Sequence, residues 1–177
     1  GETGLTGNIY CGLVEFADMA FVLHYLRPGD LFMDVGGNAG AYTLLAGRGT
    51  GADVIVVEPH PETFARLMAN IELNDIAHLV SPQQLAVGSE QGSVQFSQGL
   101  DVTNHVLDDE TEGISVEMDT VDNLVQRLGE QIPVLMKVDV EGFEWPVLKG
   151  ATAILKNPKL QALIIESAGH GLRYGHG

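Results

Sequence analysis

The sequence predicts one α/β domain built on a mostly parallel sheet with helices on both faces. From residue 31 onward, short runs rich in β-branched residues alternate with segments of helical periodicity, and parallel strands need such crossover helices. The expected strands are apolar on both faces, as strands covered on each side are. The chain has 177 residues, 45% of them hydrophobic, which is enough for one compact core and excludes a disordered chain.

In the first half of the chain, the elements follow from apolar periodicity and from glycine and proline stops. A helix is expected over 15–26, where Pro28 and Gly29 stop it, and the first strand follows at 31–35. The next helix begins near Gly40 and ends near Gly47 or Gly49. A strand at 53–58 then leads to a helix over 61–74, because Pro61 suits a first helical turn and an apolar stripe follows it.

The second half adds two strand-and-helix units and one departure from the pattern. A strand is expected at 79–85, and residues 88–118 alternate as a hairpin would, so they form an excursion from the sheet. Asp119 or Thr120 can cap a helix over 121–128. A strand at 134–138, a helix over 143–155 and a last strand at 160–166 complete the series.

Charge and composition exclude several kinds of partner. The net charge of −15 repels phosphate backbones and anionic lipids, so neither nucleic acid nor a membrane is expected as a partner. Cys11 is a single cysteine, and no Cys/His group has zinc-ligand spacing, so no disulfide or structural metal is expected. No apolar run approaches the roughly 20 residues of a membrane span, and no signal-like segment opens the chain. We therefore expect a cytoplasmic protein.

A glycine-rich turn between the first strand and its helix predicts a cofactor site. Glycines let the backbone approach a ligand closely, and a helix start offers unpaired N–H donors. The residues are Asp34, Gly36, Gly37, Asn38 and Gly40. The dinucleotide fingerprint fails, because Asn38 and Ala41 replace two of its glycines. The spacing suits S-adenosylmethionine (SAM) instead, with Asp34 binding the ammonium group of the methionine moiety. A merely tight turn is the structural alternative.

Acids at the ends of two further strands extend this prediction. Glu58 can accept hydrogen bonds from both ribose hydroxyls, although a solvated strand-end acid would look the same. Ala86 and Val87 can wall an adenine ring, or they can simply pack in the core. Glu141 is the candidate general base, and Asp139 can orient the methionine end or the acceptor. Both acids could instead cap the next helix.

Five blocks of sequence, taken in register, resemble the FkbM-type family of SAM-dependent methyltransferases. They are 29–43, 58–74, 86–88, 118–122 and 137–144, and together they cover most of residues 29–167. The resemblance implies a Rossmann-like class I methyltransferase fold and, commonly in the family, O-methylation of hydroxyls on sugars or other metabolites. It also adds Tyr42, Thr43, Pro59 and His60 to the expected cofactor contacts. The chain departs from the family in one place, with Gly37 where alanine is usual.

The class I fold normally continues beyond the last expected strand, with a helix and an antiparallel strand pair. The chain stops eleven residues after Glu166, so these C-terminal strands are missing from it. We expect the edge of the last strand to be covered by the amino-terminal segment, by a homodimer partner or by further strands. The single domain then comprises a cap segment (1–28), a SAM-binding core (29–167) and a short tail (168–177), in which His170 is a candidate acid or base.

The resulting hypothesis is a SAM-dependent methyltransferase that acts on a hydroxyl of a small polar acceptor. Methyl transfer requires that donor and nucleophile be collinear and that one proton be removed. It needs no metal, although Asp139 and Glu141 leave a metal-assisted variant open. The alternatives are a noncatalytic SAM-binding module or methyltransferase remnant and, with less support, a nicotinamide-dependent oxidoreductase.

Overall fold

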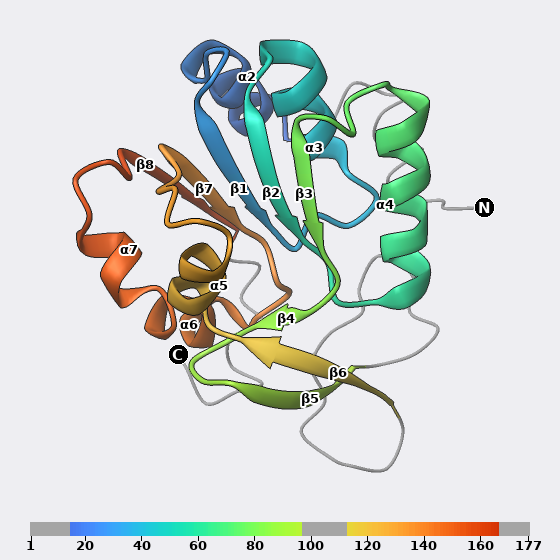
Figure 1. Ribbon diagram of the computed structural model, residues 1–177, viewed down its shortest axis with the longest axis vertical. Helices are drawn as coiled ribbons and strands as arrows, with labels where there is room; N and C mark the ends of the chain where they lie inside the picture. Colours follow the sequence, from blue (N-terminus) through green and yellow to red (C-terminus); the bar gives the residue numbers. More distant parts are fainter. Residues whose placement is uncertain (1–14, 97–112, 167–177) are drawn as a thin grey trace.

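A five-stranded parallel sheet forms the centre of the computed structural model, which describes residues 15–96 and 113–166 (Figure 1). The strand order is β3-β2-β1-β7-β8, and every pairing within this sheet is parallel. The strands are β1 (Leu31–Val35), β2 (Asp53–Val57), β3 (Val80–Gln83), β7 (Leu135–Val138) and β8 (Ala162–Ile165). All five lie within the ranges that the sequence predicts, and the α/β class is confirmed.

Helices cover both faces of this sheet, as expected. One face packs against α2 (Phe16–Tyr25), α3 (Ala41–Leu44), the π-helical η1 (Leu45–Thr50) and α4 (Pro61–Leu73). The other face packs against α5 (Val121–Arg127), α6 (Glu144–Lys149) and α7 (Thr152–Lys156). Each face buries a cluster of apolar side chains at less than 10% exposure, and β1, β2 and β7 contribute apolar residues to both clusters.

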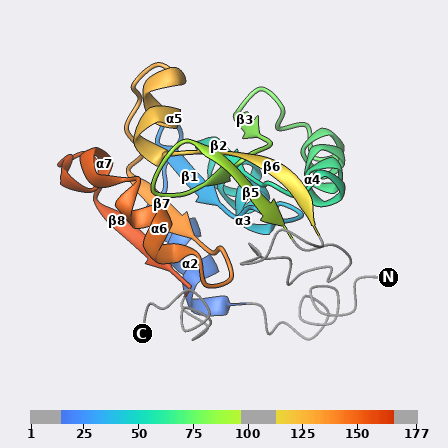
Figure 2. The same ribbon diagram turned by 90° about the horizontal axis from the view of Figure 1, so that it is seen from below.

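A second, three-stranded sheet lies beyond the carboxyl ends of the parallel strands (Figures 1 and 2). Its order is β4-β6-β5, from β4 (Ala86–Val87), β5 (Gly92–Phe96) and β6 (Ile114–Asp119). β5 and β6 are antiparallel, which confirms the predicted hairpin. The strand expected at 79–85 is shorter than predicted, because β3 ends at Gln83 and the chain then crosses to the small sheet.

Two helices differ from the prediction. The single helix expected over 143–155 is wrong, because the chain breaks at Gly150 and Ala151 between α6 and α7. Gly150 meets the carbonyl oxygen of Gly88, which would lie only 2.0 Å from a Cβ at that position. The helix after the glycine turn begins at Ala41 and continues as a π-helix until Gly51, where φ is +75°.

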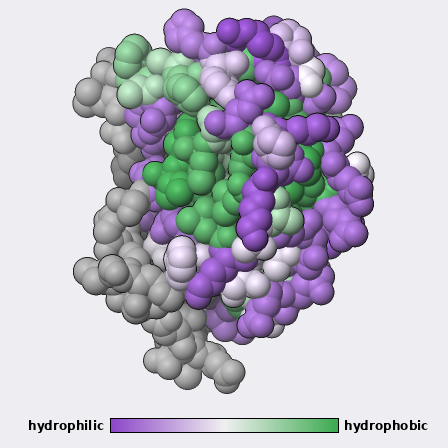
Figure 3. Space-filling view, turned by 90° about the vertical axis from the view of Figure 1, so that its left-hand side faces the viewer, coloured by the Kyte–Doolittle hydropathy of each residue, from purple (hydrophilic) through white to green (hydrophobic). Residues whose placement is uncertain are grey.

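β8 is the outer strand of the large sheet, and its residues are half-buried or exposed. Figure 3, which views the side of the molecule where β8 lies in Figure 1, shows apolar residues gathered on this face. The expected cover for this edge stays a prediction, and residues 1–14 and the tail lie outside the described part of the chain. Within the described part, no helix is long and apolar enough to cross a membrane.

Candidate functional site

The glycine turn joins the ends of three strands. Gly36 has a φ of +82°, and a Cβ there would lie 1.8 Å from the carbonyl oxygen of Asp139, which follows β7. The amides of Gly36 and Gly37 both donate to the carbonyl of Val57 at the end of β2, at 2.9 and 3.0 Å. Only glycine fits position 36, because it alone combines this φ with such a close backbone approach. The turn therefore fixes the spacing between the β2 and β7 ends.

Glu58 lies directly after β2, with only 7% of the residue exposed. Its Oε2 accepts a hydrogen bond from the Asn38 amide at 3.0 Å, and its Oε1 accepts one from the His60 amide at 2.9 Å. Burial raises the pKa of the Glu58 carboxyl to about 7, and these two amides oppose the shift. Each oxygen keeps a lone pair for a further donor, as a ribose clamp requires.

A cleft opens between the glycine turn, Glu58 and the β7 end. Its polar wall includes Gly36, Asn38, Glu58, Asp139 and Glu141. Its apolar wall includes residues of the small sheet and of the segment that follows β7, namely Leu85, Ala86, Val87, Phe96, Val140 and Phe143. Such a pairing of an apolar slot with convergent polar groups suits a nucleoside, whose base is flat and whose sugar carries donors.

The predicted site residues divide into two groups. Those that line the cleft are Gly36, Asn38, Glu58, Pro59, Ala86, Val87, Asp139 and Glu141. Gly37, Gly40, Tyr42, Thr43 and His60 belong to the same turn and helix starts but do not line it. His170 lies outside the described residues. Thr63, Phe96 and Phe143 also line the cleft, and sequence reasoning missed them because apolar and hydroxyl residues carry no distinctive pattern.

Asp34 is buried beneath the turn rather than on the wall of the cleft. It is 1% exposed, and its Oδ2 accepts a hydrogen bond of 2.7 Å from the Thr43 hydroxyl. Burial raises the pKa of this carboxyl, against the opposing influence of Lys137 and Thr43. Contact with a cofactor ammonium would require this side chain to leave its pocket, so that predicted role stays a prediction.

Lys137 on β7 is a functional candidate that sequence reasoning missed. It is 2% exposed, and its Nζ lies 2.7 Å from Asp139 Oδ2, 3.9 Å from Glu166 Oε2 and 4.5 Å from the centroid of the Tyr42 ring. Burial disfavours its charge, but the carboxylates of Asp139 and Asp34 outweigh burial and raise the pKa of the ammonium group. The sequence signal that could have found Lys137 is a charged residue inside an otherwise apolar strand, because such a residue is costly to bury unless it is paired.

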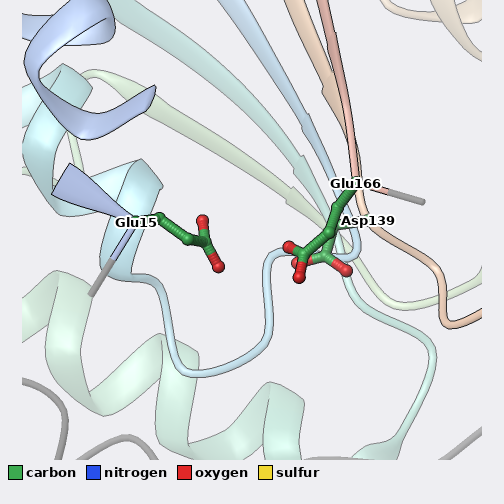
Figure 4. A group of neighbouring side chains, drawn as sticks. All are labelled: Glu15, Asp139 and Glu166. Atoms are coloured by element: carbon green, nitrogen blue, oxygen red, sulfur yellow. The ribbon is translucent and has the colours of Figure 1, made fainter. Parts of the chain in front are cut away.

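Three carboxylates come together beside this lysine (Figure 4). Glu15, Asp139 and Glu166 each place an oxygen within 4.8 Å of the others. Burial, together with the charges of Asp139 and Glu15, raises the pKa of Glu166 to about 7. The Tyr42 hydroxyl donates to Glu15, and Lys137 binds Asp139, so the described groups already give this cluster hydrogen-bonding and ionic partners.

The fold is a Rossmann-like α/β fold of the class I methyltransferase type, and its cleft lies at the carboxyl ends of the parallel strands. The chain belongs to the FkbM methyltransferase family. The family model described as the methyltransferase FkbM domain matches residues 34–171, which include the glycine turn, Glu58 and the β7 end.

Two relatives agree with this assignment, and a solved structure shares the fold. The chain is 33% identical over 137 residues to the hexuronic acid methyltransferase AglP of Haloferax volcanii, covering 77% of this chain and 56% of AglP. It is 40% identical over 80 residues to the 31-O-demethyl-FK506 methyltransferase FkbM of Streptomyces tacrolimicus, covering 44% of this chain and 30% of that protein. The crystal structure of methyltransferase FkbM from Methylobacillus flagellatus superposes with a TM-score of 0.58 and 20% identity, covering 83% of this chain and 35% of that chain. This chain thus spans about half or less of these relatives.

Proposed function

We propose that this chain is a SAM-dependent methyltransferase domain that methylates a hydroxyl of a small polar acceptor. The observation that carries the proposal is the single cleft that joins the Gly36 turn, the buried Glu58 carboxyl and Asp139. These groups match the ribose and the charged end of one elongated ligand. Membership of a methyltransferase family favours SAM over nicotinamide cofactors for that ligand.

In this proposal, each wall of the cleft receives one part of SAM. The adenine lies in the apolar slot near Val87 and Phe96, and the ribose hydroxyls donate to Glu58. The methionine end lies along the Gly36 turn toward Asp139. The sulfonium activates its own methyl group, so the chain's remaining tasks are to align the acceptor oxygen with that carbon and to accept one proton.

The acceptor end of the site lies near Glu141, which follows Asp139 at the edge of the cleft. Glu141 has a φ of +51° in a tight turn, and this turn directs the chain from β7 toward α6. We propose that Glu141 accepts the hydroxyl proton. A hexuronic acid or a related sugar is the first acceptor class to test, because the 33% identical AglP is named for one.

Binding calorimetry with SAM, its demethylated product S-adenosylhomocysteine (SAH) and NAD tests the cofactor assignment on the full chain. We expect SAM and SAH to bind at one site per chain and NAD not to compete with them. Binding of NAD in preference to SAM would favour the oxidoreductase alternative and contradict the proposal.

Turnover separates an enzyme from a binding module. We expect SAH to form from SAM in the presence of hexuronic acid glycosides, and we expect Glu141→Gln to lower the rate by about 10² to 10⁴ while SAM affinity is retained. The measurement is SAH release, with the melting temperature as a control for folding. If Glu141→Gln instead lowers both the SAM affinity and the melting temperature, this residue serves to stabilise the turn and not as the base.

A further inference from the structure

Lys137 lies in a part of the sheet where a charged side chain is costly. Its neighbours along β7 are Met136 and Val138, both fully buried, and the strand pairs with β1 and β8 on its two sides. Burying an ammonium costs several kcal/mol unless it is closely paired, and an apolar side chain of similar size often serves stability as well. The lysine therefore calls for an explanation beyond core packing.

The strand register explains which groups Lys137 meets. In parallel strands, residues in register lie on the same face, and so do residues two apart on one strand. Lys137 is in register with Asp34 on β1 and with Ile164 on β8, so Asp139 and Glu166 continue the same face at the carboxyl end. The Nζ atom reaches both of these carboxylates, at 2.7 Å and 3.9 Å.

Asp139 is held at two places and still meets the cleft. Its amide donates a hydrogen bond to the Val35 carbonyl at 3.0 Å, and its Oδ2 accepts one from the Lys137 ammonium. Its side chain keeps 26% exposure, whereas the lysine side chain keeps 3%, and Asp139 belongs to the wall of the cleft. Asp139 thus links the buried cation, which its carboxylate binds, to the cleft, which the residue helps to line.

We propose that Lys137 is a positioning residue, which fixes the Asp139 carboxylate toward the charged end of the cofactor so that the site prefers SAM to SAH. This inference rests on the proposed function. SAM and SAH share the adenosine and the amino acid ends, and they differ in the methyl group and in the positive charge on sulfur. A carboxylate held near the sulfur favours the sulfonium, and it favours the neutral thioether product less.

The alternative role for Lys137 is that of a plain countercharge, and the two roles predict opposite results. If Lys137 only neutralised its neighbours, its removal would leave Asp139 in place and make the site more negative, so the preference for SAM would rise. If Lys137 positions Asp139, its removal lets that carboxylate turn away or share a proton with Glu166, so the preference falls. Burial and the neighbouring acids raise the pKa of Glu166 to about 7, and a proton on Glu166 supports the positioning role.

The test measures the affinities of SAM and SAH by calorimetry at pH 7.5. The SAM preference is the dissociation constant of SAH divided by that of SAM. We expect Asp139→Asn to lower this preference roughly tenfold, as one unit charge in a partly screened site does. Lys137→Met should lower it by a similar factor, and Lys137→Arg, which retains the charge, should restore most of it. Glu144→Gln is the matched control, because this acid begins α6 directly after the β7–α6 connection but does not belong to the wall of the cleft.

The double variant Lys137→Met/Asp139→Asn keeps the proposal testable even if Lys137→Met alone fails to fold. Removing both charges of a buried pair leaves neither partner uncompensated. If Lys137 acts through Asp139, the double variant has the same SAM preference as Asp139→Asn, within about twofold.

Three results would overturn the inference. They are an unchanged preference in Asp139→Asn, a raised or unchanged preference in Lys137→Met, and a further change from Asp139→Asn to the double variant. A wild-type chain that binds neither SAM nor SAH would instead overturn the proposed function, and the inference with it.

Discussion

Glu58 and Asp139 follow the two strands that flank β1, so they occupy corresponding places on either side of the glycine turn. Glu58 is held by two backbone amides and buried to 7% exposure, and its pKa is raised to about 7. Asp139 is held by the ammonium of Lys137 and is more exposed. Equivalent strand ends therefore acquire different chemistry from the groups that bind their carboxylates. Amide donors suit a carboxyl that binds neutral hydroxyls, and an ammonium suits one that faces charge.

The largest expected effect comes from Gly36→Ala, which breaks the contact between the two sides. The added Cβ would lie 1.8 Å from the Asp139 carbonyl oxygen, at a φ of +82°. Backbone strain and overpacking together should lower the free energy of unfolding by about 2 to 5 kcal/mol and abolish SAM binding. Thermal unfolding and calorimetry measure the two effects. Gly92→Ala, at a glycine with open space around it, is the control and should change neither.

Glu58→Gln tests whether Glu58 and Asp139 bind different parts of the ligand. The amide nitrogen of Gln would face one of the two backbone donors, and the ribose would lose a charged acceptor, so binding should weaken by about 1 to 3 kcal/mol. Adenosine is the sharper probe, because it lacks the methionine end. We expect Glu58→Gln to weaken adenosine and SAM alike and Asp139→Asn to weaken SAM only. Equal losses of adenosine affinity in both variants would show that the two carboxylates do not bind separate parts of the ligand.

The smallest expected effect is a dependence of adenosine affinity on pH. The pKa of Glu58 is raised to about 7 in the free protein, and ribose donors favour its ionised form, so binding releases a proton below that pH. Affinity should therefore fall about fivefold from pH 7 to pH 6, since the ionised fraction of a group with a pKa of about 7 falls from about one half to about one tenth over this range. Calorimetry in buffers of different ionisation enthalpy measures the released proton, and Glu58→Gln should remove both effects.

The strands and the outline of the cleft could be predicted because each depends on local sequence. Apolar runs such as 53–57 form strands whose ends meet at one edge of the sheet, and this brings Gly36, Glu58 and Asp139 together without any knowledge of side-chain packing. The hairpin of residues 92–96 and 114–119 followed from its alternation in the same way.

The remaining features depend on contacts between distant parts of the chain. The break at Gly150 results from its approach to Gly88, some sixty residues earlier, which apolar periodicity over 143–155 does not report. The role of Lys137 emerges only from the strand register, which brings Glu166 beside it. The hydrogen bond from the Thr43 hydroxyl to Asp34 was likewise not apparent from the sequence, and the predicted contact of Asp34 with the cofactor stays a prediction.

The small sheet has a consequence for local opening of the protein. Among residues 15–96 and 113–166, its own core contains four buried side chains, whereas each face of the large sheet buries many more. Segments with few buried contacts open at a lower free energy than the core does, and their amides exchange hydrogen faster. Phe96 belongs both to this small core and to the wall of the cleft, so a cofactor bound there would contact β5 and favour its closed form. Ligand binding should then slow amide exchange in β5 and β6 more than in β1, because the ligand stabilises only the closed form.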